Sequence, residues 1–274
     1  MPQGSWPAPL GRLEEKLKER LNYPSLLQHM ISNVTQLWFW IGFGGMVLGS
    51  LGIYSLSSRF RPEDRYHVNL ALAVTVIASI TYYGLARGQA EVTLNGTVVY
   101  FGRYLDWLLT TPLLLLGLLL IALPHGKEVK ITRSQFALIC NALFLDVLMI
   151  VTGGFAVASA RTADIVFWFG VSCVSFLLLI ALMGGEVLRQ AFANGPQIGA
   201  LYSKLFLFLS LVWVWYPVLW ALGGSGFQLV SPSVEAAAYA LLDVTAKAVF
   251  GIVLLLLLAR HNSSLKKGAH SAAI

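Results

Sequence analysis

The stretch Leu241–Leu255, LLDVTAKAVFGIVLL, decides the fold, because it is apolar throughout except for a threonine, an acid and a lysine. Asp243 and Lys247 are four residues apart, which places them one turn apart on the same face of a helix. A second apolar stretch, Arg103–Leu116, reads RYLDWLLTTPLLLL and carries Arg103 and Asp106 on one helix face. A charge at the centre of a bilayer is expensive, so these four residues are candidates for function.

The composition places most of the chain in a membrane. Of its 274 residues, 57% are hydrophobic and only 12% are charged, whereas soluble domains carry about 25% charged residues. A helix needs about 20 apolar residues to cross a bilayer, and seven such spans are predicted, at residues 35–57, 66–86, 98–123, 132–158, 164–185, 199–222 and 234–259. We therefore expect an all-α membrane protein, a seven-transmembrane helical bundle at residues 35–260, with no separate soluble domain.

The segments outside the bundle carry little chemistry. Residues 1–34 contain charges and prolines instead of the apolar core and cleavage site of a signal peptide. Within them, Leu10–Leu21 has the apolar spacing of a short amphipathic helix, which is interpreted as a surface helix in preference to a partner-binding one. Residues 261–274 form a tail. Cys140 and Cys173 fall in apolar spans and are interpreted as small buried hydrophobic residues, with no disulfide and no metal site.

Loop charges predict that the N-terminus lies outside and the C-terminus in the cytoplasm, because Lys and Arg gather in cytoplasmic loops. In this orientation the inner cations are Arg59, Arg61, Arg65, Lys127, Lys130, Arg133, Arg189, Lys204, Arg260, Lys266 and Lys267. The outer cations are fewer: Arg12, Lys16, Lys18, Arg20, Arg87 and Arg161. On the outer side, Glu91–Tyr100 contains an Asn-Gly pair between β-branched residues, which predicts a two-stranded hairpin.

A buried lysine with two buried acids has two interpretations. It can be a structural ion network, in which the two helices face each other and their charges compensate. It can also be reactive, because a lysine amine in an apolar pocket forms Schiff bases with carbonyl compounds. Aromatic residues in the same spans, Trp107, Trp213, Tyr216 and Trp220, are typical of a plain core when taken alone. Together with the lysine, they favour a pocket for an elongated apolar ligand.

Several long motifs together closely resemble the microbial rhodopsins. The two stretches quoted above resemble helices C and G of that family, WVWYPVLW at Trp213–Trp220 resembles helix F, and LDVLMIVTGG at Leu145–Gly154 resembles helix D. The resemblance covers about residues 35–260, with the motifs in the family's order.

The resemblance implies roles for the matching residues. Lys247 would hold all-trans retinal as a protonated Schiff base, Asp106 would be its counterion and proton acceptor, and Asp243 would be the second acid of the counterion complex. Arg103 would be a gate on the outer side, and Tyr83 and Tyr216 would hydrogen-bond Asp243. The retinal pocket would consist of Trp107, Thr111, Leu114, Met149, Gly153, Phe169, Ser172, Trp213, Tyr216, Pro217, Trp220 and Ala246. Asp146 would be a buried, protonated acid with a structural role.

The chain departs from bacteriorhodopsin-like pumps at the proton donor. Those pumps place a carboxyl group eleven residues beyond the acceptor, roughly 16 Å further along the helix, where this chain has Gly117. The triplet Asp106, Thr110 and Gly117 resembles a subgroup of bacterial proton-pumping rhodopsins without that donor. Tyr82 stands where many proteorhodopsins place a histidine partner for the counterion, so no Asp–His complex is expected.

Two further departures concern the outer side and the pocket wall. Glu235 matches one glutamate of the pair that releases protons in bacteriorhodopsin, but the other position is Ser225. Early release from a glutamate pair is therefore in doubt. Phe169 is bulky where carotenoid-binding relatives have a glycine, which disfavours a carotenoid antenna although Gly170 is adjacent.

These features predict a light-driven outward proton pump in the inner cell membrane, which is a transporter and not an enzyme. Reprotonation would come from the cytoplasm through transient water along Leu113, Leu116, Gly117 and Leu120, and would slow as the pH rises. A sensory photoreceptor is the alternative, and a non-photochemical transporter or receptor stays open. Asp106 disfavours a chloride pump, and the triplet disfavours a sodium pump. Leu114 predicts green absorption, and relatives usually form trimers or pentamers.

Overall fold

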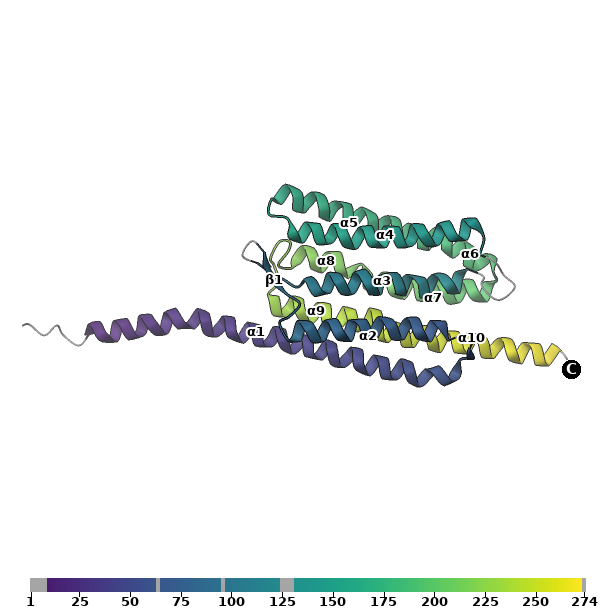
Figure 1. Ribbon diagram of the computed structural model, residues 1–274, viewed down its shortest axis with the longest axis horizontal. Coiled ribbons are helices and arrows are strands. Elements are labelled where there is room, and N and C mark those ends of the chain that lie inside the picture. Colours follow the sequence, from purple (N-terminus) through teal and green to yellow (C-terminus); the bar gives the residue numbers. More distant parts are fainter. Residues whose placement is uncertain (1–8, 63–64, 95–96, 124–130, 273–274) are drawn as a thin grey trace, which may run out of the picture.

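A computed structural model describes the backbone of residues 9–62, 65–94, 97–123 and 131–272 and the side chains of residues 32–62, 65–94, 97–123 and 131–263. Within these ranges, the helices long and apolar enough to cross a membrane run over Ser32–Arg59, Tyr66–Ala86, Phe101–Ala122, Arg133–Ala158, Thr162–Ala193, Pro196–Leu222 and Pro232–Ser263. They lie side by side along one long axis (Figure 1). The predicted seven-helix bundle is therefore confirmed.

The first four spans are straightforward. They are helices α1 (Pro9–Leu56, with the 3-10 turn η1 at Ser57–Arg59), α2 (Tyr66–Ala86), α3 (Phe101–Ala122) and α4 (Arg133–Ala158). At the start of α4, the Thr132 hydroxyl accepts from the Gln135 backbone N–H, and the Gln135 side chain accepts from the Thr132 N–H, so both free donors are satisfied. Helix α1 runs without a break from Pro9, and the amphipathic face expected for Leu10–Leu21 stays a prediction because those side chains lie outside the described residues.

The predicted hairpin is present at one end of the bundle. Strands β1 (Val92–Leu94) and β2 (Thr97–Val99) pair antiparallel, with Val92 opposite Val99. The Asn-Gly turn between them lies outside the described residues. Because the hairpin joins the end of α2 to the start of α3, it marks the end of the bundle predicted to face outward (Figure 1).

The fifth and sixth spans depart from straight helices. The fifth consists of α5 (Thr162–Leu182), the π-helix η3 (Met183–Val187) and α6 (Leu188–Ala193). It runs past the predicted end at residue 185, and in this extension Glu186 and Arg189 form an ion pair of 2.6 Å. The sixth consists of α7 (Pro196–Trp213) and α8 (Trp215–Leu222), and it breaks at Val214 because Pro217 cannot donate to the Trp213 carbonyl.

The seventh span is also interrupted. It consists of α9 (Pro232–Val244), the π-helix η4 (Thr245–Val249) and α10 (Phe250–Ala272). A π-helix inserts extra backbone into an α-helix and is frequent at functional sites. Lys247 lies at the middle of η4, so the distortion surrounds the residue that the sequence singles out.

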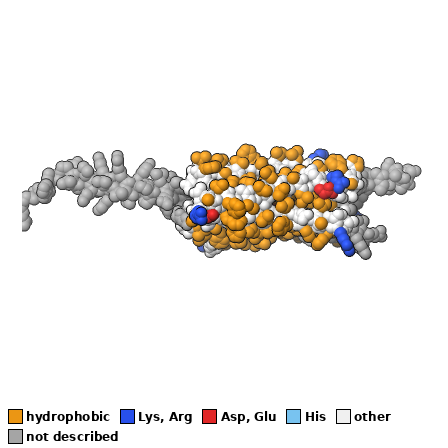
Figure 2. Space-filling model, turned by 90° about the horizontal axis from the view of Figure 1, so that it is seen from above, with side chains coloured by type: hydrophobic (Ala, Val, Ile, Leu, Met, Phe, Trp, Pro, Cys, Tyr) orange, Lys and Arg blue, Asp and Glu red, His pale blue; other side chains and the backbone are white. Residues whose placement is uncertain are grey.

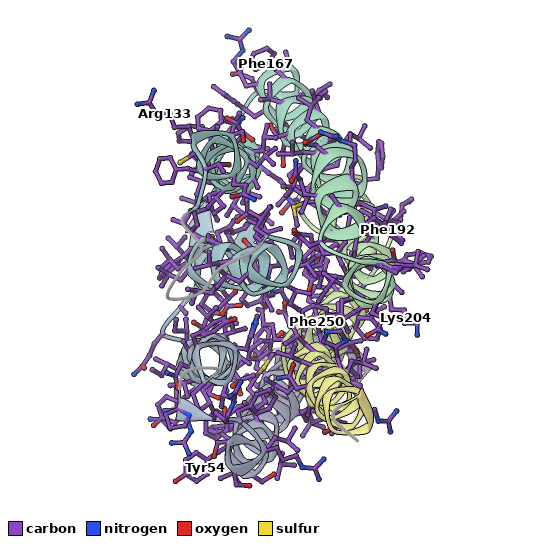
Figure 3. All side chains as sticks on the ribbon, turned by 90° about the vertical axis from the view of Figure 1, so that its right-hand side faces the viewer. Tyr54, Arg133, Phe167, Phe192, Lys204 and Phe250 are labelled. Atoms are coloured by element: carbon purple, nitrogen blue, oxygen red, sulfur yellow. The ribbon has the colours of Figure 1, made fainter. Side chains whose placement is uncertain are left out.

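The surface fits a bilayer. Hydrophobic side chains cover the middle of the face shown in Figure 2, and the charged side chains lie toward its two ends. Viewed from the end at which α10 leaves the bundle, Phe250 points inward, whereas Tyr54, Phe167 and Phe192 point outward (Figure 3). Apolar side chains thus fill the core and also form the outer wall, as expected for a protein surrounded by lipid.

The cysteines correct one interpretation of the sequence. Cys140 is exposed on the outer wall and Cys173 is half-buried, so the prediction that both are buried is wrong. The error has a physical reason: an apolar span does not distinguish a core position from one that faces lipid, because both environments favour a small apolar side chain.

Candidate functional site

The centre of the site is an ion cluster between the third and seventh spans. Lys247 is 2% exposed and Asp106 and Asp243 are each 1% exposed, so all three are withdrawn from solvent. The Lys247 Nζ forms an ion pair with the Asp106 carboxylate and lies 3.0 Å from Asp243 Oδ1. The sequence expectation that α3 and the seventh span face each other is therefore met. One cation is held between two carboxylates.

Asp243 is fixed by hydrogen bonds from three aromatic side chains. It accepts from the Tyr82 hydroxyl at 2.7 Å, from the Tyr216 hydroxyl at 2.8 Å and from the Trp107 indole N–H at 3.2 Å. These donors come from α2, α8 and α3, so three helices hold one carboxylate. Asp106 is held less firmly: its Oδ1 has no hydrogen-bond partner within the described part of the chain.

The prediction that Tyr83 binds Asp243 is wrong, and Tyr82 takes that place. Successive residues of a helix point about 100° apart, so only one of the two tyrosines can face the cluster. Tyr83 is 46% exposed and packs against Trp40 and Phe43 of α1, with ring centroids 5.9 Å apart in each case. The buried positions of α2 recur mainly every three or four residues and mark the inner face; they are His67, Val68, Ala71, Val74, Thr75, Ala78, Tyr82, Leu85 and Ala86. That spacing is the signal that identifies Tyr82.

On the hairpin side, Arg103 is turned away from the cluster toward Glu235. Its Nη1 donates to Glu235 Oε1 at 3.0 Å, and Glu235 Oε2 accepts from the Gly224 backbone N–H at 2.8 Å. The guanidinium lies over the rings of Tyr239 and Tyr100, 4.5 and 4.8 Å from their centroids, within the range of cation–π attraction. Burial raises the pKa of the Tyr100 hydroxyl, although the charge of Arg103 lowers it. Arg103 is thus buried at 5% exposure with Nη1 paired, while its Nε and Nη2 have no hydrogen-bond partner among the described residues.

A hollow at the hairpin end continues outward from this arginine. It is lined by residues of α1, the hairpin, α3, α8 and α9, among them Phe39, Glu91, Arg103, Trp220, Ser225 and Glu235. Ser225, which replaces the second glutamate of the expected pair, lies in its wall. Glu235 is the acid that pairs with Arg103, and Glu91 is a second acid in the lining of the hollow.

On the other side of the cluster, Lys247 forms the end of an apolar pocket. The pocket contains about 750 Å³ of space not filled by atoms, its open mouth included. All residues expected to contact retinal line it: Trp107, Thr111, Leu114, Met149, Gly153, Phe169, Ser172, Trp213, Tyr216, Pro217, Trp220 and Ala246. Lining residues that the sequence analysis missed are Tyr104, Ile150, Cys173, Phe176 and Tyr239.

Aromatic contacts connect residues of the pocket wall. The Phe169 and Trp220 rings stack 4.2 Å apart at an angle of 10°, and the Trp220 indole donates to the Tyr104 hydroxyl at 2.8 Å. Tyr104 is uncharged and so was not among the residues singled out for their charge. Its position three residues before Trp107 places it on the same helix face and could have predicted it. An apolar tunnel that ends at one amine fits an elongated apolar aldehyde such as retinal.

Comparisons with known proteins agree with this geometry. The family model described as bacteriorhodopsin-like protein matches residues 33–261. The chain belongs to the bacteriorhodopsin-like family. Bacteriorhodopsin of Haloterrigena sp. (strain arg-4) is 33% identical over 226 residues, which cover 80% of this chain and 86% of that protein. The predicted resemblance to microbial rhodopsins is confirmed.

Solved rhodopsin structures share the fold of this bacteriorhodopsin-like protein. Thermophilic rhodopsin from Rubrobacter xylanophilus superposes with a TM-score of 0.76 at 36% identity, covering 83% of this chain and 96% of that one. The light-driven proton pump rhodopsin from Coccomyxa subellipsoidea superposes with a TM-score of 0.73 at 31% identity, covering 81% and 96%. The chain is therefore a multi-pass membrane protein of the light-driven rhodopsin type.

The end of this bacteriorhodopsin-like protein opposite the hairpin is built differently from the hairpin end. Gly117 is buried, and a Cβ atom added to it would meet nothing within 4 Å. The Thr110 hydroxyl donates to the Asp106 backbone carbonyl at 2.7 Å and not to its carboxylate. Asp146 is fully buried and accepts from the Thr111 hydroxyl at 2.8 Å, which ties α4 to α3 beside the pocket. This contact agrees with the structural role predicted for Asp146, which stays a prediction.

Proposed function

We propose that this protein is a light-driven outward proton pump that carries all-trans retinal on Lys247. The observation that carries the proposal is the buried pairing of Lys247 with Asp106 and Asp243 at the end of an apolar pocket. A solved relative whose title calls it a light-driven proton pump shares the fold. Bound to Lys247 as a protonated Schiff base, retinal would supply light absorption and an isomerisation that moves the N–H.

Asp106 is the proposed proton acceptor. It is the nearest carboxylate to Lys247 Nζ, and its Oδ1 has no protein partner among the described residues. Asp243 accepts hydrogen bonds from three aromatic side chains and lies 3.0 Å from Lys247 Nζ. The two acids thus have different proposed roles. Asp243 keeps the cation in place, and Asp106 receives the proton when the ion pair is disturbed.

Direction follows from the two different ends of the bundle. From Asp106 toward the hairpin, the Arg103–Glu235 pair and the hollow beyond it offer polar groups for the exit of a proton. In the opposite half Gly117 offers none, so Lys247 would be reprotonated from the bulk solvent through transient water. The loop cations support N-terminus outside, C-terminus in the cytoplasm and residence in the inner cell membrane, so exit at the hairpin is outward transport. Trimers or pentamers are the proposed assemblies, and Phe169 disfavours a carotenoid antenna.

A sensory photoreceptor uses the same cluster, and the missing donor at position 117 suits a slow signalling cycle. The deciding measurement is the external pH of illuminated cells that express the protein with retinal. A pump acidifies the medium, and a protonophore abolishes the signal. A coloured protein that leaves the pH unchanged favours the sensor, and a colourless protein refutes retinal binding.

Two variants test the residues. Lys247→Ala should lose the pigment, because it removes the amine. Asp106→Asn should keep the pigment with absorption shifted to the red and should move no protons, because the acceptor is neutral. If Asp106→Asn acidified the medium as the unchanged protein does, the assignment of the acceptor would be wrong.

A further inference from the structure

We infer that Gly49 of α1 is a positioning residue for Lys247: having no side chain, it lets α1 approach η4 closely enough to hold Lys247 against Asp106 and Asp243. The inference rests on the proposed function, since it concerns the amine proposed to carry retinal. Helix α1 contributes no group to the ion cluster itself, so its influence on the site acts through packing.

The contact lies directly beside the lysine. A Cβ atom added to Gly49 would overlap the Ala248 Cβ and lie 3.2 Å from the Ala248 Cα. Ala248 follows Lys247 in the chain, is 3% exposed and belongs to the same π-helix. Because one of the crowded atoms is backbone, a methyl group at position 49 cannot be accommodated by turning a side chain. Either α1 or η4 must shift.

Neighbouring contacts restrain α1 from shifting. One residue after Gly49, the Ser50 hydroxyl donates to the Thr75 hydroxyl at 2.8 Å, and Thr75 is fully buried in α2. One turn earlier, a Cβ at Gly45 would lie 2.7 Å from Val244 Cγ2, so the close approach extends along the helix to the residue that follows Asp243. The π-helix is the less regular partner of the two. We therefore expect η4 to take up most of the displacement.

A displacement of η4 would act on the ion cluster. Lys247 Nζ is in direct contact with Asp106 and lies 3.0 Å from Asp243 Oδ1, and Asp243 is itself held by Tyr82 and Tyr216. Asp243 is therefore expected to stay in place while the amine moves, and Asp106 belongs to a different helix, α3. A longer separation weakens the electrostatic interaction of the cation with its counterion. Asp106→Asn removes the charge of that counterion altogether, so the displacement should have a smaller effect of the same kind.

The test compares the dark absorption spectra of four variants reconstituted with retinal with those of the unchanged protein and of Asp106→Asn. Gly49→Ala should shift the absorption maximum toward that of Asp106→Asn. Gly44→Ala is the matched control on the same helix, since a Cβ at Gly44 meets nothing within 4 Å, and should keep the unchanged spectrum. Ala248→Gly should also keep it. The double variant Gly49→Ala with Ala248→Gly should return the maximum toward its original position, because the methyl group is moved from one side of the contact to the other.

The outcomes separate this inference from the proposed function. If the unchanged protein is coloured and pumps, but Gly49→Ala has the spectrum of Gly44→Ala, the inference is wrong and the proposed function stands. A shift that the double variant fails to reverse also overturns it, as does a loss of thermal stability without any spectral change, since that marks a purely structural glycine. If Gly49→Ala does not fold, Ala248→Ser is used instead, because it adds one atom to the same contact from the opposite side. It should also shift the absorption maximum toward that of Asp106→Asn, and an unshifted spectrum refutes the inference. A colourless unchanged protein removes both proposals.

Discussion

Replacing Tyr82 by phenylalanine tests how the second acid is held. The substitution removes one hydroxyl and keeps the ring, which packs edge-on against Phe39 at 6.4 Å. The lost hydrogen bond is the 2.7 Å donation to Asp243 Oδ2. Tyr216 and Trp107 donate to the other oxygen, Oδ1. Without Tyr82, Oδ2 therefore loses its donor in a place that water does not reach freely.

The expected loss follows from the kind of bond. A hydrogen bond to a charged group contributes about 1.5–3 kcal/mol, whereas hydrogen bonds between membrane helices average about 0.6 kcal/mol and reach about 1.7 kcal/mol. The two ranges overlap near 1.5 kcal/mol, which we take as the expected decrease in the free energy of unfolding, roughly a tenfold change in the equilibrium constant. Tyr83→Phe is the control: that side chain is 46% exposed, and surface substitutions usually change stability by less than about 0.5 kcal/mol.

The assay is equilibrium unfolding of the retinal-free variants in mixed micelles, with increasing amounts of a denaturing detergent. Retinal is left out so that changes in the chromophore do not enter the free energy. The absorption spectra are then measured after retinal is added, and only Tyr82→Phe should alter them. If Tyr83→Phe lost as much stability as Tyr82→Phe, or if Tyr82→Phe lost none, the assignment of Tyr82 to Asp243 would be refuted.

Two further predictions concern the half of the bundle opposite the hairpin. Gly117→Asp should speed the reprotonation of Lys247 and make its rate less dependent on pH, because a carboxyl group would supply the proton that otherwise comes from solvent. Flash photolysis at several pH values measures the reprotonation rate. An unchanged rate at high pH contradicts the proposed uptake route. Tyr202→Phe should lower the free energy of unfolding by about 1–3 kcal/mol, because the buried Tyr202 hydroxyl donates to the Met183 carbonyl of the π-helix η3 at 2.8 Å; denaturation in micelles checks it, with equal stability of the two proteins as the contrary result.

The spans and the ion cluster could be predicted because both depend on strong, local signals. A bilayer demands long apolar helices, and the spacing of Asp243 and Lys247 within such a helix defines one face. Tyr83 was chosen wrongly because Tyr82 and Tyr83 are adjacent residues of the same type. They differ only in the face of the helix on which each lies, which the resemblance to the family does not fix. The burial pattern of α2 fixes it, and Tyr82 is on the inner face.

Features that depend on contacts between distant segments could not be predicted. The sequence places Arg103 one turn before Asp106, which suggests that the two interact, yet the arginine turns toward Glu235 and is enclosed by Tyr100 and Tyr239. The two π-helices were not predicted either: η3 contains Gly184 and Gly185, which are poor helix formers, but the sequence of neither segment specifies the backbone hydrogen bonds of a π-helix. The close approach of Gly49 to Ala248 likewise requires knowledge of which helices are neighbours.

The asymmetry of the bundle explains how one acid and one amine could move a proton in a single direction. Toward the hairpin, Asp106 is followed by the Arg103–Glu235 pair and an open hollow, so a proton on Asp106 has polar groups to pass along. Beyond Lys247 on the opposite side, Leu115, Leu118 and Leu119 are each no more than 1% exposed, and they close the path with apolar side chains. A membrane potential of 100 mV opposes the outward movement of each charge by about 2.3 kcal/mol. If the inner half of the bundle were open, protons would therefore leak inward. In the proposed cycle these apolar side chains would oppose that leak in the dark, and they would make proton uptake the slow, pH-dependent step.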